Sequence, residues 1–165
     1  MERIKIFTTG GTIDKVYFDA KSDYQIGEPL IRDILEEALV TTAFDVEQLM
    51  SKDSLELTDE DRRLIKDRVL AESGRNVLIT HGTDTMVETA LTLQDVPNKV
   101  IVLVGSLTPA RFKTTDALFN IGFAFAAVQA LSEGVYITMN GRIFHADQVR
   151  KNRAENRFEA LPLDA

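Results

Sequence analysis

The sequence contains no cysteine among its 165 residues. Disulfide bonds, thiolate nucleophiles and zinc sites built on cysteine are therefore excluded. Positive charge is also scarce, because 19 lysine and arginine residues stand against 26 aspartate and glutamate residues, a formal net charge of -7. Nucleic acids and anionic membranes attract basic patches, so this balance disfavours both as partners. It does not exclude a small zwitterionic ligand, because the charge of one pocket can differ from that of the whole chain.

Long apolar runs are missing as well. No stretch approaches the ~18 apolar residues that a membrane-spanning helix needs. The N-terminal residues 1–7 lack the apolar run and the small-residue cleavage site of a signal peptide, and they favour a strand instead. We therefore expect a cytoplasmic protein that does not associate with membranes.

Short apolar segments alternate with segments of helical periodicity. The apolar segments predict strands at residues 4–7, 44–49, 77–79, 100–104 and 135–139. Apolar residues at helical spacing predict helices at residues 29–40, 59–72, 85–94 and 114–131. Strands that are apolar throughout and alternate with helices are typical of a parallel sheet covered on both faces. We predict a single α/β domain over residues 1–165, a three-layer, doubly wound (Rossmann-like or flavodoxin-like), mostly parallel sheet with helices on both faces.

Glycines and hydroxyl side chains follow several of the predicted strands. In open parallel sheets, ligands bind beyond the carboxyl ends of the strands, so these residues are candidates for a site. The first such segment, residues 8–12, reads Thr-Thr-Gly-Gly-Thr and matches neither the dinucleotide fingerprint nor a P-loop. It is either a tight turn capped by a threonine or a turn that presents a hydroxyl and backbone amides to a ligand.

A second strand end carries Thr83 next to Asp84. One interpretation is a helix start, in which Thr85 and Glu88 form a capping box. The other is a hydroxyl beside a carboxylate at a ligand site. A threonine hydroxyl is a poor nucleophile without a base, and a neutral lysine is a better base than an aspartate. Lys151 is a candidate for that base, although its position alone favours an ordinary surface lysine.

Two segments resemble the signature motifs of the bacterial-type L-asparaginase/glutaminase family. They are residues 8–13 and the longer, more specific run at residues 80–90, Thr-His-Gly-Thr-Asp-Thr-Met-Val-Glu-Thr-Ala. Further similar segments follow in the family's order at residues 21–27, 51–53, 104–109, 115–117, 119–120 and 149–151. The sequence is therefore similar to this family along essentially its whole length, which favours a function for Lys151.

The resemblance implies an amidohydrolase that converts L-asparagine, and more weakly L-glutamine, to the acid and ammonia through a threonine acyl-enzyme. It implies a nucleophilic Thr12 with Tyr24 beside it, and a hydrogen-bonded triad of Thr83, Asp84 and Lys151 across the substrate. The residues alone leave open which threonine attacks.

The same resemblance implies a set of substrate contacts. Ser51 would hold the α-carboxylate, and Asp84 would meet the α-ammonium. The other implied contacts come from Gly11, Lys52, Gly82 and Ser106.

No metal or organic cofactor is implied. A zinc site needs three or four ligands, and His145 has no partner at ligand spacing. We expect His81 to support the loop rather than to take part in catalysis.

Two features depart from the family pattern. Full-length members carry a second, smaller C-terminal domain, whereas this sequence stops soon after Lys151 and resembles the short-chain, single-domain members. Lys52 stands where the family often has a polar amide, and a cation there could repel the substrate's ammonium.

The segment 114–131 is apolar around most of its circumference and needs a partner for one side. Both the missing domain and this helix predict a homo-oligomer, a dimer or a tetramer.

The segment 14–27 is long for a connection between a strand and a helix, where about 2–6 residues are usual. It carries Tyr17, Phe18 and Tyr24, so it is either an aromatic surface loop or a lid that brings Tyr24 to Thr12.

Two alternatives to the amidohydrolase also stay open. One is an amino-acid-binding module, and the other is an amidotransferase-type subunit with the same pocket.

Overall fold

A six-stranded sheet forms the centre of the computed structural model, which describes residues 2–19 and 23–162. The strands are β4 (Phe44–Lys52), β1 (Ile4–Gly10), β5 (Asn76–Thr80), β6 (Val100–Val104), β7 (Gly134–Met139) and β8 (Arg142–His145), in that spatial order. The first five are mutually parallel, and β8 pairs antiparallel with β7 at the edge.

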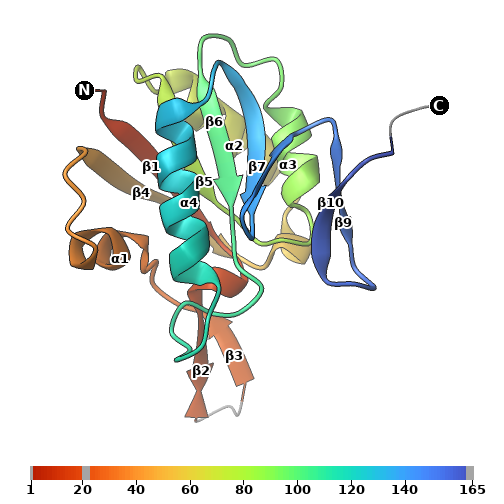
Figure 1. The fold of residues 1–165 in the computed structure, drawn as a ribbon. Coiled ribbons are helices and arrows are strands. Elements are labelled where there is room, and N and C mark those ends of the chain that lie inside the picture. The colour runs from red at the N-terminus through yellow and green to blue at the C-terminus, as the bar shows by residue number, and fades with distance from the viewer. Residues whose placement is uncertain (1, 20–22, 163–165) are drawn as a thin grey trace.

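Helices cover both faces of this sheet (Figure 1). Helices α1 (Ile31–Glu37) and α4 (Ala117–Ala130) lie on one face, and α2 (Asp59–Ala71) and α3 (Met86–Thr92) lie on the other. Successive strand residues point to opposite faces, so Leu78 packs with α1 and α4 whereas Ile79 packs with α2 and α3. Burial on both faces explains why the strands are apolar throughout. The predicted three-layer α/β fold is confirmed.

The strand order creates a topological switch point. In chain order, the five parallel strands lie as 2-1-3-4-5, the flavodoxin-like arrangement. The chain leaves β1 toward β4 on one side and then continues to β5 on the other side. The loops after β1 and β5 therefore diverge, and the crevice between their carboxyl ends is where such sheets bind ligands.

Two hairpins form in segments where the sequence analysis predicted no strands. The segment 14–27 is not an open loop: β2 (Lys15–Phe18) and β3 (Asp23–Ile26) pair antiparallel and project from the carboxyl end of the sheet (Figure 1). Near the C-terminus, β9 (Val149–Asn152) pairs with β10 (Arg157–Ala160). This second hairpin forms in a polar segment because Val149 and Phe158 enter the core on its inner side.

Local capping agrees with the sequence at one helix and differs at another. At the start of α2, Thr58 Oγ1 accepts from the Asp61 amide at 3.2 Å and Asp61 Oδ2 accepts from the Thr58 amide at 2.9 Å, a capping box. Thr85 is the N-cap of α3, but the capping box with Glu88 that one interpretation of the sequence contained does not form. The Thr85 hydroxyl donates instead to the carbonyl oxygen of Ser54 at 2.7 Å, which ties α3 to the short 3₁₀ turn Ser54–Glu56.

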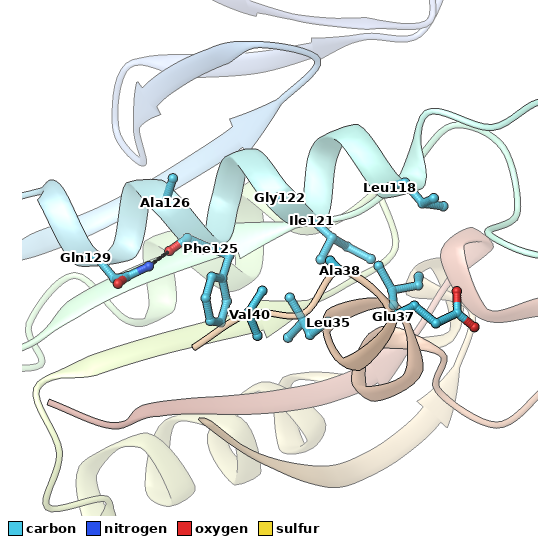
Figure 2. A pocket seen from close by; sticks show the side chains of 11 residues that line it. Leu35, Glu37, Ala38, Val40, Leu118, Ile121, Gly122, Phe125, Ala126 and Gln129 are labelled. Carbon is cyan, nitrogen blue, oxygen red and sulfur yellow. Dashed lines mark hydrogen bonds between the residues drawn. The ribbon is translucent and has the colours of Figure 1, made fainter. Parts of the chain in front are cut away.

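A groove lies between α1 and α4, on the face of the sheet shown in Figure 2. Its lining is mainly apolar and includes Leu35, Val40, Ile121 and Phe125. The residues that line it include none of the predicted site residues. No helix in the described part of the chain is both long and apolar enough to span a bilayer.

Candidate active site

The loops after β1 and β5 pack backbone against backbone at the switch point. A Cβ atom on Gly11, whose φ is +91°, would lie 2.5 Å from the backbone nitrogen of Gly82. A Cβ atom on Gly82 would in turn lie 2.6 Å from the Cβ of Ser54. Only glycine allows these approaches. Because Thr12 follows Gly11 and Thr83 follows Gly82, this packing brings the two threonines to the same edge of the sheet.

Thr83, Asp84 and Lys151 form a hydrogen-bonded cluster. Lys151 Nζ lies 2.7 Å from Thr83 Oγ1 and 2.8 Å from Asp84 Oδ1. Thr83 is 7% exposed, and the Lys151 side chain is 10% exposed. Lys151 reaches this position because it lies on β9, which packs against α3. The arrangement can move a proton between a hydroxyl and an amine while a carboxylate holds the amine in place.

Thr12 begins a 3₁₀ turn, Thr12–Asp14, directly after β1. Its side chain is partly exposed, whereas the neighbouring Thr9 is buried and donates from its hydroxyl to the Thr80 carbonyl at 2.8 Å. The Thr9 contact fixes the end of β1 against the end of β5. A partly exposed hydroxyl on a rigid turn is suited to meet a ligand in the crevice.

Asp14 is a site feature that the sequence reasoning missed. Its side chain is buried, and Oδ2 has no hydrogen-bond partner among the described residues. Burial raises the pKa of the Asp14 carboxyl to about 7, although a backbone hydrogen bond from Leu30 and the charge of Arg111 act in the opposite direction. No charge pattern in the sequence marks this residue, because the cause is burial beneath the turn that carries Thr12.

This buried carboxyl predicts a pH-dependent stability. Folded Asp14 binds a proton below a pH of about 7, whereas the unfolded chain binds it only below about pH 4. Its contribution to stability is therefore full below about pH 4 and is lost as the pH rises through about 7. We expect Asp14→Asn to be more stable than the wild type at about pH 8, by on the order of 2–4 kcal/mol, and nearly equal at about pH 4. Urea unfolding at both pH values measures this, and an equal difference at the two values would contradict it.

The end of β4 carries Ser51 and Lys52, which were predicted to follow the strand but lie within it. Ser51 is exposed and lies beside the Gly10 backbone, since a Cβ atom on Gly10 would be 3.1 Å from the Ser51 carbonyl carbon. Lys52 Nζ binds both carboxylate oxygens of Asp61 at 3.0 and 2.9 Å. Lys52 is thus neutralised at the start of α2, and its ammonium is directed toward that helix.

The loop after β6 holds Ser106 in a closed turn. Ser106 is 1% exposed and its hydroxyl donates to the Thr108 carbonyl at 2.6 Å, so this hydroxyl is not free to donate to a ligand. Asp116 fixes the same loop, because its carboxylate accepts from the amides of Leu107 and Thr108 and from the side chain of Asn120. The sequence indicated Asp116 only as part of a family motif, and its spacing of four residues from Asn120 on a helix is the signal for this pair.

The hairpin β2–β3, which follows the turn that bears Thr12, presents Tyr24 in an exposed aromatic cluster. Tyr24 is 46% exposed, and its ring lies 5.3 Å from that of Tyr17 and 5.8 Å from that of Phe112. Arg111 fastens the base of the hairpin by donating to the carbonyl oxygens of Asp14 at 3.0 Å and Glu28 at 2.7 Å. Lys21 and Ser22, which belong to the matching motif, lie outside the described residues.

His81 supports the loop after β5 from below. It is fully buried, with Nδ1 2.6 Å from the Gly82 carbonyl and Nε2 2.7 Å from the Thr89 hydroxyl. Burial lowers the pKa of His81 to about 4, which keeps the ring neutral at physiological pH. His145 contacts the ring of Tyr136 instead. Within residues 2–19 and 23–162, no cluster of three or more histidine, aspartate or glutamate side chains could hold a metal ion.

The fold and the site together define a class of protein. It is an α/β protein with a flavodoxin-like sheet, whose switch point carries two threonines and a lysine–carboxylate pair. Within that class, the chain belongs to the asparaginase family, since the family profile described as "Asparaginase, N-terminal" matches residues 3–161.

Individual relatives agree with this assignment. The chain is 32% identical over 162 residues to a probable periplasmic L-asparaginase of Haemophilus influenzae, which covers 92% of this chain and 46% of the relative. The solved structure of L-asparaginase I from Vibrio cholerae is 26% identical with a TM-score of 0.84, covering 99% of this chain and 52% of that chain. A probable cytoplasmic L-asparaginase from Campylobacter jejuni is 30% identical with a TM-score of 0.71, covering 97% and 52%. The chain thus spans about half the length of these relatives.

Proposed function

We propose that this chain hydrolyses the side-chain amide of L-asparagine to aspartate and ammonia through a threonine ester. The observation that carries the proposal is the contact of Lys151 with both Thr83 and Asp84, at 2.7 and 2.8 Å, beside the turn that bears Thr12. A sensor or a carrier of amino acids has no need of a buried lysine on a threonine hydroxyl, whereas acyl transfer needs a proton acceptor there.

In the proposed reaction, Thr12 Oγ attacks the amide carbon and its proton ends on the leaving nitrogen, so that ammonia departs. Water then adds to the β-aspartyl ester, the carbon–Oγ bond breaks, and Thr12 regains its proton. In this second step neutral Lys151, oriented by Asp84, accepts the Thr83 proton while Thr83 takes a proton from the attacking water, and the proton on Lys151 is passed on to the departing Thr12 oxygen. The exposed Ser51 hydroxyl and the Asp84 carboxylate fit the α-carboxylate and the α-ammonium of the substrate.

A steady-state ammonia assay with the purified chain tests this proposal. We expect release from L-asparagine, and slower release from L-glutamine because its amide carbon lies one methylene further from the α-carbon that Ser51 and Asp84 hold. A cytoplasmic location stays a prediction, since the names of the relatives include both a periplasmic and a cytoplasmic protein.

The lid hypothesis concerns the Tyr24 hydroxyl. We infer that the β2–β3 hairpin moves so that this hydroxyl reaches Thr12 and relays its proton. Tyr24→Phe should therefore keep the affinity for aspartate and lower kcat by on the order of 10²-fold. Tyr17→Phe is the matched control, because Tyr17 lies on the same hairpin with a similar exposed fraction, 48% against 46%. A wild-type kcat for Tyr24→Phe would reject the lid.

We also propose a homo-oligomer with two-fold symmetry. Helix α4 has no charged residue from Ala117 to Ala130, and Leu118 and Phe119 are 54% and 61% exposed. An uncharged surface with large apolar side chains is suited to a second copy of the same chain, whose net charge of -7 disfavours contact elsewhere. Light scattering should report a dimer or a tetramer, and Phe119→Glu should shift it toward the monomer. A wild-type monomer at micromolar concentration would contradict this.

A further inference from the structure

Asp84 is shared by two cations. Its Oδ1 lies 2.8 Å from Lys151 Nζ and 3.7 Å from Arg153 Nε, and Arg153 Nη2 also donates to the Asp84 carbonyl oxygen at 3.2 Å. Lys151 lies on β9 and Arg153 is the first residue of the turn that follows this strand, and both side chains reach the same carboxylate. Arg153 does not belong to the segments that resemble the family motifs, and the sequence reasoning missed it.

The neighbouring cations each have a carboxylate of their own. Lys52 pairs with Asp61 at 2.9 Å, and Arg150 pairs with Glu159 at 2.6 Å. Within the described part of the chain, the ion pair of Arg153 is with Asp84. The Asp84 cluster therefore carries one positive charge in excess when Lys151 is protonated.

We propose that Arg153 is a positioning residue that sets how strongly the site selects a ligand with an α-ammonium group. The inference rests on the proposed function, in which Asp84 binds the ammonium of the substrate. Arg153 lies beside the same carboxylate, so its positive charge competes with an incoming ammonium for the attraction of Asp84. The site consequently discriminates less than it otherwise would between an α-amino acid and the same acid without its amino group.

The geometry makes such competition feasible. The Arg153 side chain is 62% exposed and its distance to Oδ1 is long, so solvent weakens this ion pair. The hydrogen bond to the Asp84 carbonyl can persist while the Nε contact is released. Arg153 has no contact with Thr83, unlike Lys151, and it is therefore expected to affect binding of the ammonium rather than the chemical step.

Calorimetric binding of L-aspartate and of succinate, which lacks the amino group, tests this inference. We expect Arg153→Gln to raise the affinity for aspartate relative to succinate by about two- to fivefold, the upper part of the range of an exposed ion pair. Arg153→Lys, which keeps the charge, should restore the wild-type ratio. Arg150→Gln is the matched control, because Arg150 is similarly exposed but faces Glu159, and it should leave the ratio unchanged.

The possible outcomes separate this inference from the proposed function. An unchanged ratio would reject the inference, and if both affinities change by the same factor the role of Arg153 is merely structural. If the wild type releases ammonia from asparagine in either case, the proposed function stands. If the wild type binds neither ligand and releases no ammonia, the proposed function is wrong and the inference fails with it. Turnover by Arg153→Gln should retain the wild-type kcat, and a large loss of kcat would contradict the inference.

Discussion

Replacing either Thr12 or Thr83 by valine is expected to lower the turnover of L-asparagine by on the order of 10³-fold or more. Valine keeps the shape of threonine and removes only the hydroxyl. Thr12 would lose the attacking oxygen, and Thr83 would lose the group that Lys151 contacts at 2.7 Å. Because the two hydroxyls would act as one unit, the double variant should be scarcely slower than the single variants.

Thr138→Val is the matched control for these substitutions. Thr138 is a fully buried threonine on β7, and its hydroxyl has no hydrogen-bond partner among the described residues. Its replacement should leave turnover unchanged and leave the free energy of unfolding equal or higher. Retention of more than about a tenth of the wild-type rate in both Thr12→Val and Thr83→Val would reject the assignment.

Lys151→Met is expected to lower kcat by on the order of 10²–10³-fold, the usual contribution of a positioned proton acceptor. Methionine has a similar length and no charge, so the β9–β10 hairpin should keep its packing through Val149 and Phe158. The loss should appear in kcat because the lysine contacts Thr83, and an additional rise in KM is expected because Asp84 loses its closest partner, at 2.8 Å.

Lys66→Met provides the same chemical change at a surface ion pair. Lys66 pairs with Asp95 at 2.7 Å beyond the C-terminal end of α3, whereas Thr83 lies before the N-terminal end of that helix, so the loss of Lys66 should leave kcat unchanged. Equal rates for Lys151→Met and the wild type, with both folded by circular dichroism, would remove Lys151 from the mechanism.

The layers of the fold could be predicted because a strand that is buried on both faces of a sheet is apolar at every position. Strands such as β6 (Val100–Val104) are apolar at every position, and the helices between them repeat their apolar residues at helical spacing. The β7–β8 hairpin was not predicted, although the pair Asn140–Gly141 is a typical sequence signal of a tight hairpin turn. In the structure these two residues have φ values of +49° and +84°. The β2–β3 and β9–β10 hairpins are polar on most of their surface, so their apolar content gave no comparable signal.

The candidate site could be predicted in part. Strand-end loops rich in glycine and hydroxyl groups converge wherever parallel strands end, so Gly11, Thr12 and Thr83 could be expected to meet. Lys151 is 67 residues away from Asp84 in the sequence, and only the docking of β9 on α3 brings the two together. Composition alone could not place it, and the family resemblance was required.

Other features of the site depend on side-chain directions that no sequence pattern specifies. The ammonium of Lys52 is bound by Asp61, which removes the basis for expecting it to repel a substrate. Ser106 was predicted to contact the substrate, and its hydroxyl is used within its own turn. The burial of Asp14 and the approach of Arg153 to Asp84 likewise arise from packing between distant segments.

We propose above that Thr12 and Thr83 hydrolyse the side-chain amide of asparagine. Nuclear magnetic resonance with asparagine labelled with ¹⁵N in its side-chain amide tests it most directly. The wild-type chain and the Thr12→Val/Thr83→Val double variant would be purified in parallel from a host without asparaginases of its own. We expect the wild type to convert the amide signal to ammonium with an equal amount of aspartate, and the double variant to leave the amide intact. Unchanged asparagine with the wild type, or equal conversion by both chains, would contradict the account.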